Sequence, residues 1–413
     1  MKVLISAYSC EPGRGSERGV GWNVAREVAK RHEVWVLTRP DESKAAIEAE
    51  LAAHPIPNLH FVYFTLPFWQ DSMRWGQSGA MQIHYYLWQI QAYFVARRLH
   101  QEIGFDLMHH VTFVKYSAPS LIACVPVPFV WGPVGGGESA PPKFWQDFSL
   151  KARLYELARD CVRQMGERDP FVALTIRNSA IVRATTDDTA KRLYRMGASH
   201  VDIVPEVGLL EEEIAALNAY PLPSSRSVRF ISMGRLLHWK GFHLGIQAFA
   251  EANLPDAEYW LVGDGPELAT LQRLAQDCGV AGQVKFWGRL SREATLERLG
   301  ESHVLVHPSL HDSGGWVCVE AMAAGRPVIC LNLGGPAIQV TDQTGFRVAG
   351  QDPQQAIRDM AIAMTQLAQA PDLQHQMGQA GRRRVDDYFS WTAVGERLDA
   401  LYQTTVVNTL AVA

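Results

Sequence analysis

The chain alternates short apolar runs with stretches in which apolar residues recur at helical spacing. The first such runs are expected to be strands, at residues 3–7, 33–37, 61–63, 107–110, 129–131 and 180–184. Apolar or small residues between the first two runs follow one helix face, at Val20, Val24, Ala25, Val28 and Ala29. Strand, loop, helix and strand in this order are typical of a doubly wound parallel sheet.

The same alternation restarts near residue 227. Further strands are expected at 227–234, 258–262, 284–286, 303–306 and 327–330. Helices are expected at 241–252 and from residues 268 and 316 onward. The sequence therefore predicts an α/β protein with two Rossmann-like domains that face each other across a cleft. The predicted boundaries are 1–205 for the first domain, 206–226 for a linker and 227–387 for the second domain.

Length and composition agree with two globular domains. The 413 residues are 47% hydrophobic and 20% charged, and the net charge of −4 gives no reason to expect nucleic acid as a partner. The N-terminus does not resemble a secretory signal, and no apolar run is long enough to cross a membrane. The six cysteines are scattered without zinc-binding spacing. We therefore expect a cytoplasmic protein with reduced thiols.

The segment 304–330 carries the strongest chemical pattern. A buried strand is followed by the glycine-containing loop 311–315, which opens a helix. Glycines allow a ligand to approach the backbone, and a helix N-terminus favours an anion such as a diphosphate. Asp312 and Glu320 stand eight positions apart, where carboxylates could accept hydrogen bonds from sugar hydroxyls. An alternative is that Asp312 only caps the helix and Glu320 forms a surface ion pair.

A second pattern lies at 234–241, again at the end of a predicted strand. Arg235 and Lys240 place two positive charges just before a helix. A departing nucleoside diphosphate needs such charge, from a metal ion or from side chains. Because the sequence contains no Asp-x-Asp pair, we expect the two cations to replace a metal. Taken alone, this segment would also fit a solvated basic turn.

Together, the two patterns resemble glycosyltransferase family 4, a family of retaining enzymes with the GT-B fold. Its motif, EGFGLVxLEAMAxGxPVI, is matched here from Asp312 to Ile329, with Asp312 and Glu320 in place of the two glutamates. Ser313 and Gly314 replace the Gly-Phe pair of the motif, and the first carboxylate is one methylene shorter. The resemblance implies that Asp312 contacts the donor sugar and that Glu320 contacts the nucleotide ribose.

The resemblance also implies roles outside this motif. Arg235 and Lys240 match the family's diphosphate-binding pair, and His110, with His109 beside it, lies near the family's active-site histidine, whose usual position is Val111 here. Gly15 matches the second glycine of the N-terminal Gly-Gly loop. The catalytic residues expected on this basis are Arg235, Lys240, Asp312 and His110. The donor-binding residues expected are Gly15, Ser313, Gly314, Gly315, Trp316, Glu320, Gly263, Gly288 and Leu290.

The expected activity is metal-independent transfer of a sugar, with retention, from a nucleotide diphosphate sugar to a hydroxyl group. The nucleotide sugar is then a substrate, and no cofactor is expected. The resemblance implies a saccharide or lipid-linked saccharide acceptor in bacterial surface polysaccharide or glycolipid synthesis, and Glu138 is a further candidate for acceptor contact. It also implies that a C-terminal helix, 388–413, crosses back to the first domain.

Residues 66–105 are rich in aromatic side chains, at Phe68, Trp69, Trp75, Tyr85, Tyr86, Trp88, Tyr93 and Phe94. One interpretation is that they fill the core of the first domain. The other is that, with Arg74, Arg97 and Arg98, they form a peripheral contact with the inner face of a membrane.

Three rival functions remain open from the sequence. Residues 135–140 fit the G-x-G-x-x-A pattern of a nicotinamide-dependent dehydrogenase, but they do not follow the first strand, and no acidic residue closes the second. A GT-B sugar-nucleotide epimerase would share the same donor site. A non-catalytic module would bind the sugar nucleotide without turnover.

Overall fold

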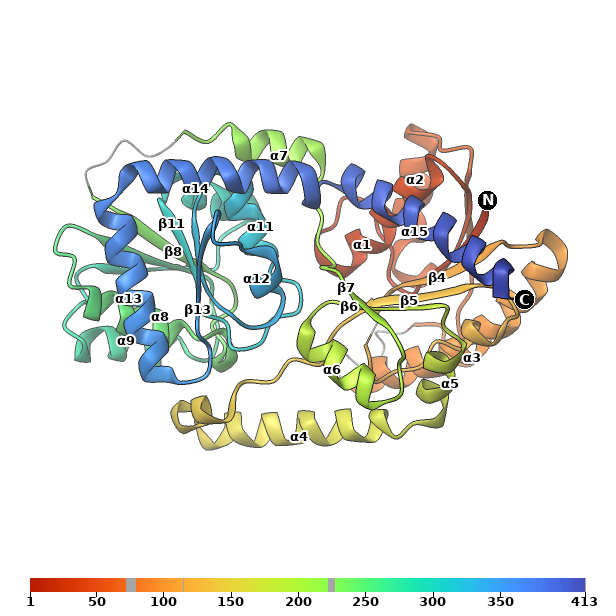
Figure 1. Cartoon of the computed structure of the whole chain (residues 1–413), viewed down its shortest axis with the longest axis horizontal. Coiled ribbons are helices and arrows are strands. Elements are labelled where there is room, and N and C mark those ends of the chain that lie inside the picture. The colour runs from red at the N-terminus through yellow and green to blue at the C-terminus, as the bar shows by residue number, and fades with distance from the viewer. Residues whose placement is uncertain (72–78, 114, 222–226, 413) are drawn as a thin grey trace. The chain divides into compact units, whose positions relative to one another are not determined.

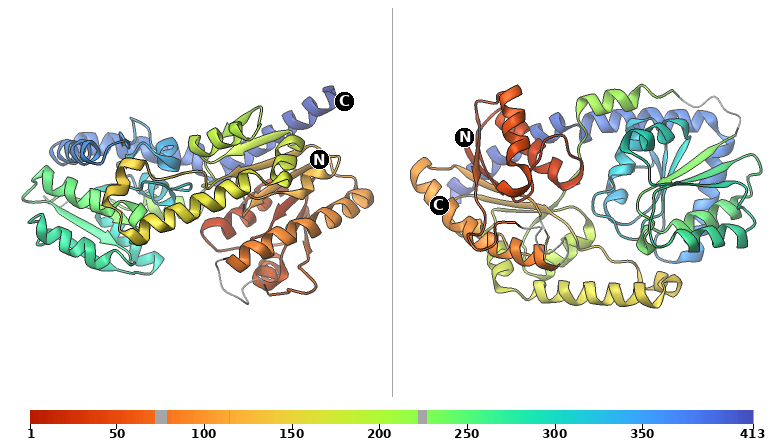
Figure 2. Two further views of the ribbon diagram at one scale, coloured as in Figure 1. Left: turned by 90° about the horizontal axis from the view of Figure 1, so that it is seen from below. Right: turned by 180° about the vertical axis from the view of Figure 1, so that it is seen from behind.

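The computed structural model describes residues 1–71, 79–113, 115–221 and 227–412, which form two parallel sheets with helices on both faces of each (Figure 1 and Figure 2). The chain divides into two compact units. The first consists of Met1–Gly137, Ala158–Gly208 and Trp391–Ala413, and the second of Glu138–Leu157 and Leu209–Ser390. The sequence-based boundaries differ most at Glu138–Leu157, which they placed in the first domain.

The sheet of the first unit has seven parallel strands in the order β3-β2-β1-β4-β5-β6-β7. They are β1 (Lys2–Ala7), β2 (Glu33–Thr38), β3 (Leu59–Tyr63), β4 (Leu107–Thr112), β5 (Phe129–Val134), β6 (Ile181–Ala184) and β7 (Val201–Ile203). The helices of this unit are α1 (Ser16–Ala29), α2 (Pro40–Ala53), α3 (Gly79–Ile103), α5 (Pro170–Asn178), α6 (Asp187–Arg195) and α15 (Trp391–Val412). The helix α4 (Leu150–Glu167) continues from the second unit into the first.

The sheet of the second unit has six parallel strands in the order β10-β9-β8-β11-β12-β13. They are β8 (Arg229–Met233), β9 (Glu258–Val262), β10 (Val284–Gly288), β11 (Val304–His307), β12 (Val328–Leu331) and β13 (Gly345–Val348). Its helices are α7 (Glu211–Asn218), α8 (Phe242–Ala252), α9 (Leu268–Asp277), α10 (Arg292–Glu301), α11 (Trp316–Ala323), α12 (Gly334–Gln339), α13 (Pro353–Gln369) and α14 (Pro371–Arg384). The predicted α/β class with two doubly wound sheets is confirmed.

The strand order places the predicted site at a defined point of the second sheet. From β8 the chain winds outward through β9 and β10, then returns to β11 on the other side of β8. In open α/β sheets, ligands bind at the carboxyl ends of the strands where the winding direction reverses. The two segments with predicted chemistry follow β8 and β11, so they emerge side by side at this switch point.

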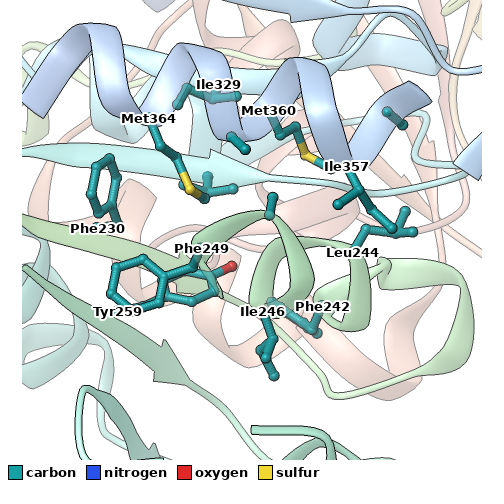
Figure 3. Packing of buried hydrophobic residues seen from close by; sticks show 14 of the residues in the cluster. Phe230, Phe242, Leu244, Ile246, Phe249, Tyr259, Ile329, Ile357, Met360 and Met364 are labelled. Carbon is teal, nitrogen blue, oxygen red and sulfur yellow. The ribbon is translucent and has the colours of Figure 1, made fainter. Parts of the chain in front are cut away.

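The core of the second unit packs α8 and α13 against the sheet. Figure 3 shows Met360 and Met364 of α13 above Phe230 and Tyr259, and all four side chains are fully buried. Long apolar side chains on β8, β9 and β12 thus meet the helices without solvent between them. This packing fixes the strand ends that carry the site loops.

The aromatic stretch 66–105 divides between core and surface. Tyr85 and Trp88 of α3 are buried in the core of the first unit, as the first interpretation predicted, whereas Phe68 and Phe94 are largely exposed. Arg74 and Trp75, and residues 222–226 of the predicted linker, lie outside the described residues. Among the described residues, no helix combines the length and apolar character needed to cross a bilayer.

Gly263 after β9 offers a test of how tightly the strand ends pack. Its φ is +142°, and a Cβ added there would lie 1.9 Å from the carbonyl oxygen of Gly234. Gly263→Ala should therefore lower the free energy of unfolding by about 2–4 kcal/mol, because backbone cannot move aside. Urea unfolding of the purified protein measures this loss.

Two other glycines serve as controls for that experiment. Gly288 has φ +66° but open space around it, so Gly288→Ala should cost only about 1–2 kcal/mol from the backbone conformation. Gly282 has neither constraint, and Gly282→Ala should change stability by less than about 0.5 kcal/mol. Equal losses at Gly263 and Gly282 would contradict the close approach.

Candidate functional site

The loop after β8 is tied to the neighbouring strand ends by backbone hydrogen bonds. The Gly234 amide donates to the Val262 carbonyl (2.9 Å), and the Leu236 amide donates to the Asp264 carbonyl (2.9 Å). Leu236 is fully buried and anchors the loop. Arg235, one residue earlier, is exposed, and in the part of the chain that the structure describes its side chain makes no hydrogen bond or ion pair. Its charge is therefore available to a ligand.

Lys240 and Asp312 join the two predicted segments directly. The Lys240 Nζ lies 2.5 Å from Asp312 Oδ2, and both side chains are about four-fifths buried, at 21% and 17% exposure. The buried His307 at the end of β11 lies 3.2 Å from the same oxygen through its Nε2. Because a carboxylate only accepts hydrogen bonds, His307 Nε2 must carry the proton and donate it.

These neighbours fix the ionisation of Asp312. Burial by itself would raise the pKa of Asp312, but the hydrogen bond from His307 and the charge of Lys240 outweigh it and hold the pKa well below the usual range. Burial lowers the pKa of His307, although Asp312 opposes that change. The site thus contains a carboxylate, an ammonium group and a neutral imidazole on one shared oxygen.

The loop that opens α11 is shaped around Gly315. Its φ is +56°, and its amide donates to Asp312 Oδ1 (3.2 Å). Gly315 is itself the N-cap residue of α11, so Asp312 braces the loop before the helix and does not cap the helix as the alternative interpretation expected. Gln339 Nε2 donates to the Gly314 carbonyl, and a Cβ at Gly315 would lie 2.6 Å from Gln339 Oε1. Trp316 is the first residue of α11, whose N-terminal amides are suited to an anion.

Ser313 and Glu320 already have protein partners. The Ser313 Oγ donates to Oε2 of the buried Glu138 at 2.6 Å. Glu320, on the second turn of α11, is buried and accepts from Arg292 Nη1 (2.8 Å), while Arg292 Nη2 donates to Glu213 (3.0 Å). Burial raises the pKa of Glu320 against the pull of Arg292. The surface ion pair expected as the alternative is therefore a pair with a buried carboxylate.

Sequence reasoning missed the supports of this site. The buried Glu156 of α4 accepts from His238 Nε2 (3.0 Å) and from His311 Nε2 (3.2 Å), one residue in each site loop. Trp239 stacks between Tyr155 and His311, with ring centroids 5.4 and 5.3 Å away. Only His307 had a sequence signal, because it ends a predicted strand five residues before Asp312. Glu156 and Arg292 come from distant parts of the chain.

The remaining predicted donor-binding residues lie at neighbouring strand ends. Gly263 follows β9, and its amide donates to the carbonyl of Gly288, the last residue of β10 (2.8 Å). Leu290 follows β10 and is partly buried. In the first unit, Gly15 is the residue before α1 and has open space around it. Donor contact by these four residues stays a prediction.

His110 is placed differently from a typical exposed acid–base residue. Its side chain is fully buried, Nε2 lies 3.0 Å from the Thr112 carbonyl, and Nδ1 lies 2.5 Å from Ser120 Oγ. His109 is likewise engaged by the Gly132 carbonyl (2.6 Å) and by the Tyr402 hydroxyl (2.5 Å). Both imidazoles therefore have protein partners at both ring nitrogens, and a catalytic role for His110 stays a prediction.

Candidate metal ligands do not gather in the described ranges: no three histidine, cysteine, aspartate or glutamate side chains there are arranged to hold an ion. The charges observed at the switch point of the second sheet belong to protein side chains. Independence from metal stays a prediction.

Two doubly wound parallel sheets of this kind are the architecture of the GT-B fold of glycosyltransferases. The Anabaena protein HepE, solved in complex with UDP and glucose, is similar over 98% of this chain and 100% of its own, with a TM-score of 0.60 and 18% identity. That similarity establishes the fold.

The family follows from the second unit. Residues 221–384 match the family model described as glycosyl transferases group 1. The predicted resemblance to a glycosyltransferase family is confirmed for this part of the chain.

Two curated relatives match in part. A GDP-mannose-dependent monoacylated α-(1-6)-phosphatidylinositol monomannoside mannosyltransferase of Corynebacterium glutamicum is 35% identical over 41% of this chain and 45% of its own length. A lipopolysaccharide core biosynthesis glycosyltransferase of Rhizobium meliloti is 34% identical over 40% of this chain and 46% of its own. The chain thus spans less than half of the length of each relative.

The buried histidines of β4 predict a pH dependence of stability. Burial lowers the pKa of His109 to about 3 and that of His110 to about 4. An unfolded histidine has a pKa of about 6.5, so between about pH 6.5 and pH 4 the unfolded chain binds more protons and stability falls as the pH falls. Each histidine should contribute about 1.4 kcal/mol per pH unit to this slope.

The contribution of one histidine is isolated by His110→Gln, which removes the titrating group. Urea unfolding between about pH 7 and pH 5 should give a mean slope shallower than that of the wild type by about 1 kcal/mol per pH unit. An unchanged slope would show that His110 is already protonated, or equally protonated, in both states.

Proposed function

We propose that the chain is a retaining glycosyltransferase of family 4 that moves a sugar from a nucleotide diphosphate donor to a hydroxyl acceptor without a metal ion. The observation that carries the proposal is the arrangement at the switch point of the second sheet. Lys240 is held against Asp312, and Arg235 stands exposed on the same loop. The match of residues 221–384 to the group 1 family model supports it.

The leaving diphosphate determines how much positive charge the site must supply. When the bond between the sugar and the diphosphate breaks, negative charge grows on the phosphate oxygen. Arg235 and Lys240 supply two positive charges, and the first amides of α11 supply the positive end of a helix dipole. The fold holds Lys240 and the α11 amides in place, whereas the exposed Arg235 has to turn toward the donor.

Retention is accounted for by attack from the side that the phosphate leaves. The acceptor oxygen forms a bond to the anomeric carbon while the bond from that carbon to the phosphate oxygen breaks. The departing phosphate oxygen takes the proton of the acceptor hydroxyl. The protein supplies position and charge, which suits a site with ion-paired carboxylates and a fully occupied His110.

Donor and acceptor classes follow from the relatives. One relative is named as GDP-mannose-dependent, and HepE was solved with UDP, so guanosine and uridine diphosphate sugars are the donors to compare. The curated relatives act, by their names, on a phosphatidylinositol mannoside and in lipopolysaccharide core synthesis. We therefore propose a saccharide or lipid-linked saccharide acceptor, in surface polysaccharide or glycolipid synthesis at the cytoplasmic face of the membrane.

Removing the exposed cation tests the leaving-group role. Arg235→Ala should lower kcat by about 10²–10³-fold, because one of the two side-chain charges that stabilise the leaving diphosphate is lost, while folding is unaffected. Arg273→Ala is the matched control, since Arg273 is an exposed arginine of α9 in the same unit. Turnover of Arg235→Ala close to that of the control would reject the assignment.

Chelation tests the absence of a metal. Turnover with the best donor of a uridine and guanosine diphosphate sugar screen should change by less than about twofold in EDTA, because side chains neutralise the diphosphate. A strict requirement for Mg²⁺ or Mn²⁺ would contradict this part. A second experiment incubates the donor without an acceptor. Conversion of the donor to another sugar nucleotide would indicate an epimerase.

A further inference from the structure

A hollow in the second unit lies between the N-terminal halves of α8 and α9, which run side by side (Figure 1). Its volume is about 230 Å³, which is room for a small organic molecule. The loop after β8 and the segment 147–149 before α4 complete its walls. All of these segments belong to the second unit, and none of the lining residues is assigned to the transfer reaction.

Apolar side chains form one part of the lining. Phe148, Phe242 and Leu271 are at most 4% exposed and belong to the core of the second unit, where Figure 3 shows Phe242. The Phe148 ring packs edge to face against His238, with the ring centroids 4.8 Å apart. Because the core holds these side chains, the hollow has a defined shape, which limits the entropy that is lost when a ligand binds.

Polar side chains form the other part of the lining. Asp147 and Glu267 offer carboxylate oxygens, which accept hydrogen bonds, whereas Gln247 and Thr270 offer groups that both donate and accept. Within the described ranges, these four side chains make no hydrogen bond or ion pair with other protein groups. They are therefore available to a ligand that needs donors and acceptors together.

His243 adds a polar atom that lacks a partner. Its Nε2 is shielded from solvent and has no hydrogen-bond partner among the residues that the structure describes. Burial lowers the pKa of His243 to about 4, so the imidazole is neutral near pH 7. A buried polar atom without a partner costs free energy unless a water molecule or a ligand satisfies it. This atom is a separate indication that a polar ligand completes the hollow.

The charges of the lining restrict the class of ligand. The described lining contains two carboxylates, a neutral His243, and neither lysine nor arginine. A phosphate, a nucleotide or a uronic acid would bring negative charge close to Asp147 and Glu267 without a compensating cation. The hollow thus differs in kind from the donor site proposed around Arg235 and Lys240.

A neutral saccharide matches both parts of the lining. Its hydroxyl groups donate to carboxylates and also exchange hydrogen bonds with amide, hydroxyl and imidazole groups. The C–H groups on one face of a pyranose ring are apolar and pack against aromatic side chains such as Phe148 and Phe242. A simple amine would pair with Asp147 and Glu267 but would leave the groups of Gln247 unused.

We propose that this hollow is a second saccharide-binding site, which holds one neutral sugar unit outside the donor site. It shares a wall with the loop that carries Arg235 and Lys240, because His238 lines the hollow and is bound to Glu156 at 3.0 Å. The inference goes beyond the proposed function. Binding at the hollow requires no transfer, so the two proposals stand or fall separately.

Saturation-transfer NMR with methyl glycosides tests the class of ligand. The neutral probes are the methyl α-glycosides of D-glucose, D-galactose and D-mannose, and the charged counterpart is the methyl α-glycoside of D-glucuronic acid. At least one neutral probe should bind with a Kd of about 1–10 mM, as expected for so few atoms. The glucuronide should bind at least about tenfold more weakly than the glucoside. Saturating UDP and GDP should not displace the neutral probe.

Paired substitutions test the residues. Asp147→Ala/Gln247→Ala removes an acceptor and an amide from the hollow, so it should weaken binding of the neutral probe by about tenfold. Gln276→Ala/Asp277→Ala is the matched control, because both residues are exposed on α9 outside the hollow, and it should bind like the wild type. Thermal unfolding verifies that both variants are folded.

Three results would overturn the proposal. The first is the absence of saturation transfer to every neutral probe, and binding of cyclohexylammonium in that case would assign the hollow to cations. The second is undiminished binding of the neutral probe by Asp147→Ala/Gln247→Ala. The third is displacement of the neutral probe by UDP or GDP, which would place the sugar in the donor site.

Discussion

The ion pair between Lys240 and Asp312 is the interaction on which the site depends. It joins the loops after β8 and β11, which the reversal of strand order brings side by side, and it does so with both groups mostly out of water. Without Asp312, a partly buried ammonium group would lack its compensating charge. The pair therefore holds one cation in position at an edge of the sheet where the other, Arg235, remains exposed.

Under the proposed function, the two cations meet an incoming donor in different ways. Arg235 is solvated and can meet an incoming diphosphate at little cost beyond its own side-chain entropy. Lys240 must share its charge with Asp312, so a bound phosphate competes with a carboxylate for it. The clamp formed by Glu156, His238 and His311 limits how far the two loops can separate during this exchange. The same few contacts thus hold the two loops in position and place their charged side chains.

The sequence predicted the central strands and both site loops, because buried parallel strands are short apolar runs and the loops carry glycines beside charges. It missed β7 and β13, which are edge strands of three and four residues with few apolar positions. It also missed Glu156 and Arg292, since Glu156 meets His311 across 155 positions and Arg292 meets Glu320 across 28. A pattern among neighbouring residues of the sequence does not show contacts between positions so far apart. The position of His110 at the end of a predicted strand did not show that its side chain is buried.

Asp312 shows why a departure from a family motif needs the structure for its interpretation. Where the family motif has glutamate, this chain has Asp312, whose side chain is one methylene shorter. Its carboxylate lies within hydrogen-bond distance of Lys240, His307 and the Gly315 amide, all of which belong to the protein. Both carboxylate oxygens of the shorter residue are therefore engaged by protein groups in this structure, and its contact with a donor sugar stays a prediction.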